Sequence, residues 1–234
     1  MDCNGKRIVI TGGSSGIGLE TARRLTAKGA RLLITGRRAD ALEDAARELG
    51  CAYVVADVGT REGVAATVAA AHQALGGVDV LLNNAAVGEF ERMEDVTWEM
   101  LEQVYAVNVF GAAMLAAALV PGMKAQGSGT IINIASTSSQ RGFALGSIYG
   151  ASKFAMRGMT QCWQDELRRF NIRVCLVNPS EVTTAFNQPD RQERPDEAHK
   201  LRPEEIAHVI LSVLEMDDRG FVPEVTVWAT NPFA

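Results

Sequence analysis

Tyr149 and Lys153 have the residue types and the spacing that acid–base chemistry requires. They lie four positions apart on a predicted helix, so both project from one face and can meet the same bound molecule. A phenol has a pKa of about 10, and a nearby ammonium favours its phenolate form. We therefore expect Lys153 to lower the pKa of Tyr149, which can then donate or accept a proton.

A tyrosine and a lysine at this spacing can also be an exposed helical pair without any role. Ser136, however, lies thirteen residues before Tyr149 and directly after a predicted strand, at the sheet edge where ligands of open sheets bind. Its hydroxyl can hydrogen-bond an oxygen on which charge develops. The presence of this serine favours the chemical interpretation of the pair.

A glycine-rich segment, Thr11-Gly-Gly-Ser-Ser-Gly-Ile-Gly18, follows the first predicted strand and precedes a helix. Its spacing is G-x-x-x-G-x-G, and its strand–turn–helix context is typical of a dinucleotide site. Glycines let the backbone approach a pyrophosphate, and N–H groups at a helix N-terminus face the anion. A plain turn is the alternative, and the alternating strands and helices disfavour it. The expected phosphate-binding residues are Gly12, Ser14, Ser15, Gly16, Ile17 and Gly18.

The end of the second predicted strand bears on the choice of cofactor. An acidic residue there accepts hydrogen bonds from a ribose 2′-hydroxyl, whereas this chain has Arg37 and Arg38, and its first acid is Asp40. Arg37 can hold a 2′-phosphate with two N–H bonds and stack on the adenine. Alternatively, both arginines simply begin a solvated helix. We predict NADP(H), with NADPH bound at least tenfold more tightly than NADH, which corresponds to roughly 1.4 kcal/mol.

Short β-branched runs alternate along the chain with longer helical stretches, and the runs are apolar on both faces. We predict an α/β fold with a single domain over residues 1–234, a doubly wound parallel sheet of seven strands and helices on both faces. Thr60 and Thr97 are expected to be helix N-caps. The predicted strands are Arg7–Ile10, Arg31–Thr35, Ala52–Val55, Val78–Leu82, Thr130–Ile134, Arg173–Val177 and Val225–Val227; the predicted helices are Ile17–Ala27, Ala39–Leu49, Arg61–Leu75, Trp98–Lys124, Tyr149–Phe170 and Pro203–Met216.

Charge and cysteine usage exclude several classes of protein. The formal net charge is −5, and no basic run offers a footprint for nucleic acid or an anionic membrane. The four cysteines lack the spacing of a zinc site or a disulfide framework, and free thiols suit a reducing cytosol. The longest apolar run, Ala112 to Val120, is too short to span a bilayer. We expect a cytoplasmic protein with no metal site and no nucleic-acid or membrane partner.

Seven motifs, which together cover almost the whole chain, resemble those of the common type of short-chain dehydrogenase/reductase, in that family's order and at its usual spacing. The resemblance implies a Rossmann fold, a nicotinamide cofactor and a Ser-Tyr-Lys centre supported by an asparagine. The matching segments are Thr11-Gly-Gly-Ser-Ser-Gly-Ile-Gly18, Ala56-Asp57-Val58, Asn83-Asn84-Ala85, Asn108, Ser136, Tyr149-Gly-Ala-Ser-Lys153 and Asn178-Pro179.

The same resemblance implies that Lys153 binds the nicotinamide ribose, that Asn108 positions a water connecting Lys153 to solvent, and that Asp57 meets the adenine amine. Asn108 can equally be a buried, satisfied amide, and Asp57 can merely cap the turn after the third strand. Ala86 and Ser180 stand where the family often has glycine, which affects the fine cofactor geometry and the path of the following loop. Further expected cofactor contacts are Val58, Asn84, Ala85, Tyr149, Pro179, Val182 and Thr184.

Residues 180–202 contain prolines and a dense mixture of charges, which predicts a loop over the carboxyl edge of the sheet. It is either a substrate lid or a solvated surface excursion. The substrate pocket should have apolar walls, which suit a ketone, an aldehyde or a secondary alcohol of modest size. The expected wall residues are Val87, Phe90, Phe143, Leu145 and Phe186.

Together these features predict an NADP(H)-dependent oxidoreductase that transfers a hydride between nicotinamide and a carbonyl compound or alcohol, with Tyr149 as proton donor or acceptor. One alternative is a 3-oxoacyl-[acyl-carrier-protein] reductase, whose acidic partner would dock near the entrance on Lys124, Arg168 and Arg169. Another is a catalytically idle NADP(H)-binding regulator. The resemblance implies a homotetramer or dimer.

Overall fold

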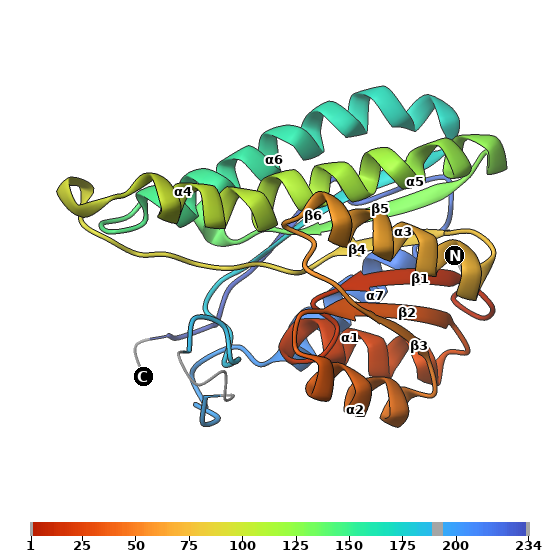
Figure 1. Ribbon diagram of the computed structural model, residues 1–234, viewed down its shortest axis with the longest axis horizontal. Coiled ribbons are helices and arrows are strands. Elements are labelled where there is room, and N and C mark those ends of the chain that lie inside the picture. Colours follow the sequence, from red (N-terminus) through yellow and green to blue (C-terminus); the bar gives the residue numbers. More distant parts are fainter. Residues whose placement is uncertain (1, 189–193, 233–234) are drawn as a thin grey trace.

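The computed structural model describes residues 2–188 and 194–232, which form a seven-stranded, wholly parallel sheet with helices on both faces (Figure 1). The strand order is β3-β2-β1-β4-β5-β6-β7, so the predicted fold class is confirmed. The strands are β1 (Arg7–Thr11), β2 (Arg31–Gly36), β3 (Ala52–Val55), β4 (Val80–Asn83), β5 (Gly129–Ile134), β6 (Ile172–Pro179) and β7 (Glu224–Val227); the helices are α1 (Gly16–Ala27), α2 (Ala39–Leu49), α3 (Arg61–Leu75), α4 (Trp98–Tyr105), α5 (Ala112–Gln126), α6 (Ser147–Leu167) and α7 (Pro203–Glu215).

Two hydrophobic cores lie on opposite faces of the sheet. Ile8 and Ile10 of β1 pack with α1, α2 and α7, whereas Val9 packs on the other face with α3, α4, α5 and α6. Successive residues of a strand point to opposite faces, which explains why the strands are apolar on both sides. Figure 1 shows the two helical layers on either side of the sheet.

The predicted helix over residues 98–124 is not a single regular α-helix. A π-helical segment, Ala106–Gly111, separates α4 from α5. Here the helix passes close to the chain that follows β3: a Cβ atom added to Gly111 would lie 2.3 Å from the carbonyl oxygen of Val58. The sequence pattern gave no signal for this change of helix type, because the apolar residues of the π segment continue the apolar pattern of its neighbours.

The combined stretch Trp98–Gln126 is 29 residues long and is apolar enough to cross a membrane by length and composition. The uninterrupted apolar run Ala112–Val120 underestimated this apolar stretch, because the helix predicted over residues 98–124 extends on both sides of the run and continues through Pro121. Half of its most apolar 18-residue window is buried inside the fold, and Val104, Leu115 and Leu119 belong to the core on that face of the sheet. It is therefore a core helix of this domain.

Both predicted threonine caps are confirmed. The hydroxyl oxygen of Thr60 accepts from the N–H of Gly63 at the start of α3, and that of Thr97 accepts from Met100 at the start of α4. Such caps satisfy N–H groups that have no partner within the helix.

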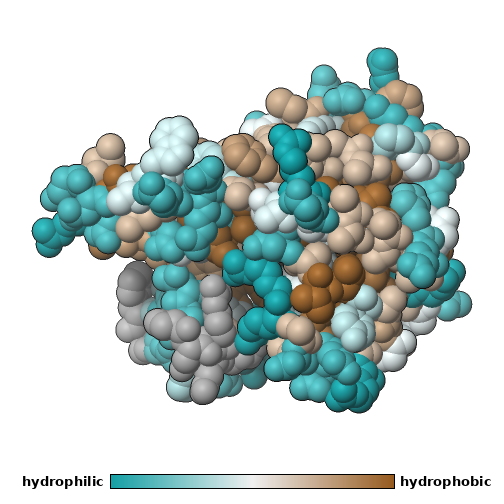
Figure 2. All heavy atoms as spheres, in the orientation of Figure 1, coloured by the Kyte–Doolittle hydropathy of each residue, from teal (hydrophilic) through white to brown (hydrophobic). Residues whose placement is uncertain are grey.

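Two loops reach past the carboxyl edge of the sheet. The segment between β4 and α4 projects from the body of the molecule (Figure 2). The predicted lid, residues 180–202, is tied at its base by a bridge between Val182 and Leu201. Within the lid, residues 189–193 lie outside the described part of the chain.

Candidate active site

The glycine-rich turn between β1 and α1 lines one end of a cavity of about 750 Å³. Gly12 and Gly16 have φ values of +65° and +51°, which glycine adopts without strain. Ser15, the N-cap of α1, makes no side-chain capping bond, and the first-turn N–H groups have no acceptor within the helix. This end of the helix can accommodate a pyrophosphate.

Gly18 has a packing role: of the six expected phosphate-binding residues, the other five line the cavity and Gly18 does not. A Cβ atom there would lie 2.2 Å from the carbonyl oxygen of Gly12. Asn84 supports the same turn, because its side-chain N–H groups donate to the carbonyl oxygens of Thr11 and Gly12 at 2.9 and 3.1 Å. The Asn84 side chain therefore stiffens the loop, and Asn84 and Ala85 both line the cavity, as predicted.

Arg37, Arg38, Asp57 and Val58 meet at the same end of the cavity. The guanidinium of Arg37 lies 3.7 Å from the carboxylate of Asp57, and both side chains are partly exposed. Asp57 also accepts from the N–H of Gly59 at 2.9 Å, so it does cap the turn after β3, as one of the two interpretations expected. Two adjacent guanidiniums against one carboxylate leave positive charge for an anion.

Ser136, Tyr149 and Lys153 come together at the other end of the cavity. Ser136 follows β5, and Tyr149 and Lys153 lie in the first turns of α6. The hydroxyl of Ser136 accepts from the N–H of Ser138 at 3.1 Å and lies close enough to the phenol of Tyr149 to influence its pKa. The Lys153 ammonium is fully buried, donates to the carbonyl oxygen of Ile134 at 3.0 Å, and lies 5.6 Å from the centre of the Tyr149 ring. The structure thus assembles the predicted catalytic group.

The pKa values of this pair differ from the expectation. Burial raises the pKa of Tyr149 to about 12, and the hydrogen bond with Ser136 opposes this rise. Burial lowers the pKa of Lys153 to about 8. The prediction that Lys153 brings the tyrosine pKa down does not hold in this structure, because desolvation dominates both groups and the ammonium is bonded to a backbone carbonyl.

Asn108 is a buried amide in the π-helical segment. Its side chain exchanges two hydrogen bonds with the backbone of Val87, each 2.9 Å, and donates to the hydroxyl of Ser152 at 3.0 Å. Ser152 in turn donates to the carbonyl oxygen of Tyr149. The side chain therefore joins the β4–α4 loop to α6. These contacts bear out the expected buried, satisfied amide, and the role in positioning a water stays a prediction.

Aromatic rings surround the Tyr149 side chain. The ring centres of Phe90 and Phe186 lie 5.3 and 5.5 Å from that of Tyr149, and Phe143 is 6.1 Å from Phe90. Val87 also lines the cavity. Leu145 differs from the expectation: its side chain is half exposed and lies outside the cavity lining of the described residues. Its positive φ of 66° turns the chain there, and its carbonyl oxygen accepts from Glu91.

The strand and loop after Asn178 supply the predicted contacts Pro179, Val182 and Thr184, all of which line the cavity. The sequence interpretation missed Glu181 and Arg194, which also line it and form an ion pair of 2.8 Å. They are separated by 13 positions in a charge-rich segment, so no regular spacing signalled that they would meet.

The three basic residues suggested as a docking surface lie far from the cavity entrance. Arg168 and Arg169 follow the C-terminal end of α6, a helix of 21 residues and therefore about 30 Å long, whereas Tyr149 is in its first turn. Lys124 pairs with Glu166 at that same far end. The expectation of a basic surface beside the entrance, built from these residues, is wrong.

Comparisons with known proteins agree with this geometry. A model of the family described as short chain dehydrogenase matches residues 6–195. An uncharacterized oxidoreductase of Staphylococcus aureus (strain MRSA252) is 33% identical over 229 residues, covering 95% of this chain and 96% of that protein.

Two solved structures are also similar. An alcohol dehydrogenase from Thermococcus sibiricus, complexed with 5-hydroxy-NADP, superposes with a TM-score of 0.88 at 30% identity, covering 96% of this chain and 97% of that one. A 3-ketoacyl-(acyl-carrier-protein) reductase from Brucella melitensis, complexed with NADH, has a TM-score of 0.88 at 28% identity, covering 99% and 100%.

The fold and the site therefore define an oxidoreductase of the kind that acts on CH–OH and C=O groups. The chain belongs to the short-chain dehydrogenase family.

Proposed function

We propose that this protein is an NADP(H)-dependent oxidoreductase that interconverts a ketone or aldehyde with the corresponding alcohol. The observation that carries the proposal is that Ser136, Tyr149 and Lys153 line the same cavity as the glycine turn and Arg37. One continuous cavity can thus hold a dinucleotide beside a small carbonyl compound.

In this proposal the cofactor carries the hydride, and side chains of this chain handle the proton and the charge on oxygen. A bound nicotinamide would supply or accept the hydride. Tyr149 gives its proton to the carbonyl oxygen during reduction, and Ser136 donates a hydrogen bond to the same oxygen as charge develops on it. Lys153 stabilises the phenolate that is left. Phe90 and Phe186, which pack against the Tyr149 ring, supply apolar walls beside the reacting atoms.

Turnover of a carbonyl panel by the holoenzyme tests this proposal. NADPH oxidation is followed with ketones, aldehydes, diketones and 3-oxoacyl thioesters, and Tyr149→Phe is the control. We expect turnover by the wild type and a loss of at least a hundredfold in the variant, since general acid catalysis contributes about 10²- to 10⁴-fold. Turnover retained by Tyr149→Phe would refute the assigned acid. Tight NADPH binding with no turnover of any compound would favour a regulator.

Arg37 and Arg38 support NADP(H) over NAD(H), because they leave positive charge beside the single carboxylate of Asp57. Fluorescence titration should give at least tenfold tighter binding of NADPH than NADH, or roughly 1.4 kcal/mol. Arg37→Gln should remove most of that preference while leaving the NADH dissociation constant within about twofold. Equal dissociation constants for the two cofactors in the wild type would contradict the proposal.

Reduction of 3-oxoacyl groups on acyl carrier protein is the second candidate, supported by the similarity to the Brucella melitensis reductase. Of the basic residues that would have favoured it, Arg168 and Arg169 follow the far end of α6, and Lys124 of α5 pairs with Glu166 there. The thioester arm of the panel separates the two: 3-oxoacyl thioesters turned over at least tenfold faster than simple ketones would favour this candidate.

A cytoplasmic location is part of the proposal. It rests on the four cysteines, all of which are free thiols.

A further inference from the structure

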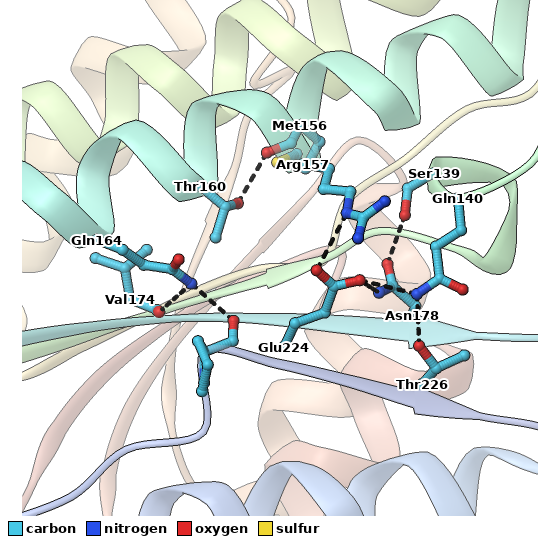
Figure 3. Close-up of polar contacts among 11 residues, drawn as sticks. Ser139, Gln140, Met156, Arg157, Thr160, Gln164, Val174, Asn178, Glu224 and Thr226 are labelled. Carbon is cyan, nitrogen blue, oxygen red and sulfur yellow. Dashed lines mark hydrogen bonds and ion pairs between the residues drawn. The ribbon is translucent and has the colours of Figure 1, made fainter.

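Glu224, in the last strand, accepts hydrogen bonds from three different parts of the molecule (Figure 3). Its carboxylate accepts from the Arg157 Nε at 3.1 Å, from the Asn178 Nδ2 at 2.9 Å and from the Gln140 Nε2 at 2.8 Å. Glu224 lies beyond residues 6–195, the part matched by the family model. The Glu224 side chain is 23% exposed, so these bonds are partly shielded from water.

Each of the three partners belongs to a segment that carries a residue of the proposed site. Arg157 is one helical turn beyond Lys153 on α6, the helix that also bears Tyr149. Asn178 directly precedes Pro179, which lines the cavity. Gln140 ends the short 3₁₀ turn η3 (Thr137–Ser139), whose N-cap is Ser136.

Asn178 extends the contact towards Ser136. Its amide is fully buried, its Nδ2 donates to Glu224, and its Oδ1 accepts from the hydroxyl of Ser139 at 2.8 Å. The N–H of Ser139 donates to the carbonyl oxygen of Ser136. A continuous series of hydrogen bonds therefore joins Glu224 to Ser136, which lines the cavity together with Tyr149.

We propose that Glu224 is a positioning residue, which fixes the Ser136 turn relative to the Tyr149 helix. The effect of Glu224 on the reaction rate rests on the proposed function. A buried series of hydrogen bonds anchored by a carboxylate holds its members more rigidly than neutral bonds do. Since displacement of a reacting group by about 1 Å can cost about a hundredfold in rate, loss of this anchor should act on kcat.

Gln164 provides a matched control on the same helix. Its Nε2 donates to the carbonyl oxygens of Val174 and Pro223, so it also ties α6 to β6 and to the residue before β7 (Figure 3). In the hydrogen bonds described here it touches neither η3 nor Asn178. A purely structural contribution of the Glu224 contacts should resemble that of Gln164.

The test compares kcat and KM for the NADPH-dependent reduction in wild type, Glu224→Ala, Gln164→Ala, Ser136→Ala and the double variant Ser136→Ala/Glu224→Ala. We expect Glu224→Ala to lower kcat about 10- to 100-fold, with KM for NADPH within about twofold, and Gln164→Ala to leave kcat within about twofold. In the Ser136→Ala background, Glu224→Ala should lower kcat by less than about threefold, because residues that act together are not additive.

Equal kcat losses from Glu224→Ala with and without Ser136, or equal kcat losses in Glu224→Ala and Gln164→Ala, would overturn the proposal. If Glu224→Ala does not fold, Ser139→Ala is judged by the same criteria, since it removes one buried hydroxyl from the series.

If the wild type reduces no carbonyl compound, the proposed function fails separately from the positioning role of Glu224. Crystal structures then decide the positioning role: an unchanged distance between the hydroxyls of Ser136 and Tyr149 in Ser139→Ala would overturn it.

Discussion

Burial moves the pKa values of Tyr149 and Lys153 in opposite directions. That of the tyrosine rises to about 12 and that of the lysine falls to about 8. Tyr149 therefore holds its proton throughout the neutral range, which suits a proton donor in carbonyl reduction. Lys153 is the member of the pair whose charge changes near neutrality, so it should govern the pH dependence of the reaction.

We expect the rate of carbonyl reduction to depend on the charge of Lys153. This charge stabilises the phenolate that Tyr149 leaves on giving up its proton. We expect kcat for reduction to be level below the lysine pKa and to fall as the pH rises through about 8. A pH series of NADPH oxidation measures this. The residual activity of Lys153→Met should lack the fall; the same fall in that variant would assign it to another group.

The second prediction concerns stability. Lowering the Lys153 pKa from 10.5 to about 8 corresponds to a cost of about 3 kcal/mol for holding the charge in the fold at pH 7. Lys153→Met should therefore raise the free energy of unfolding at pH 7, by about 1–3 kcal/mol after loss of the bond to Ile134. Urea denaturation measures the change.

The sign of the pH effect on stability follows from linkage. Between about pH 8 and 10.5 the unfolded chain binds the lysine proton and the folded chain does not, so wild-type stability rises with pH across this window. The advantage of Lys153→Met should shrink accordingly. Lys124→Met, at a partly exposed lysine on α5, is the control and should show no such gain; an equal gain there would rule out burial of Lys153 as the cause.

At the scale of elements, the interrupted helix α4–α5 brings distant segments of the site together. Its π-helical segment carries Asn108, which holds Val87 and Ser152, and Gly111, which lies against the backbone of Val58. The helix thus touches the chain next to the cofactor end of the cavity and the chain next to Tyr149. A residue with a side chain at Gly111 could not pack in this way.

The third prediction compares two glycines of this helix. Gly111→Ala would place a Cβ 2.3 Å from the Val58 oxygen, whereas Gly122→Ala meets no atom within 4 Å. We expect Gly111→Ala to destabilise the protein by about 2 kcal/mol or more and to weaken NADPH binding. Gly122→Ala should stabilise it by about 0.5–1 kcal/mol, because alanine loses less backbone entropy in a helix. Thermal unfolding measures both, and similar changes would contradict the steric argument.

At the scale of the whole molecule, apolar side chains remain exposed on neighbouring helical segments. Phe110 and Met114 are four residues apart and more than half exposed, and Phe154 of α6 is 44% exposed. Such a group on adjacent helices favours contact with another protein surface. We propose that a second copy of this chain covers it, in line with the dimer or tetramer expected from the sequence.

The fourth prediction is the oligomeric state. Light scattering should give the mass of two or four chains, and Phe110→Glu should lower it, because a carboxylate is costly to bury in an apolar contact. Val55→Glu, at an exposed apolar position on the edge strand β3, is the matched control and should leave the mass unchanged. A single-chain mass for the wild type would contradict the proposal.

The sequence by itself determined the order of strands and helices, the cofactor turn and the Ser136, Tyr149 and Lys153 group. These depend on local patterns: apolar periodicity, caps such as Thr60, glycine before a helix, and a four-residue spacing on one helix face. These patterns can be read from the sequence because the contacts that produce them join residues close together in the chain.

Only the tertiary structure decided the direction of the Tyr149 and Lys153 pKa shifts and the position of Leu145 outside the cavity lining. The same holds for the hydrogen bonds of Asn108 with Val87 and Ser152. It also holds for those of Glu224 with Arg157, Asn178 and Gln140. Each of these depends on burial or on contacts between residues far apart in the chain. Desolvation and long-range hydrogen bonds have no periodic signature, so they become visible only when the segments are packed together.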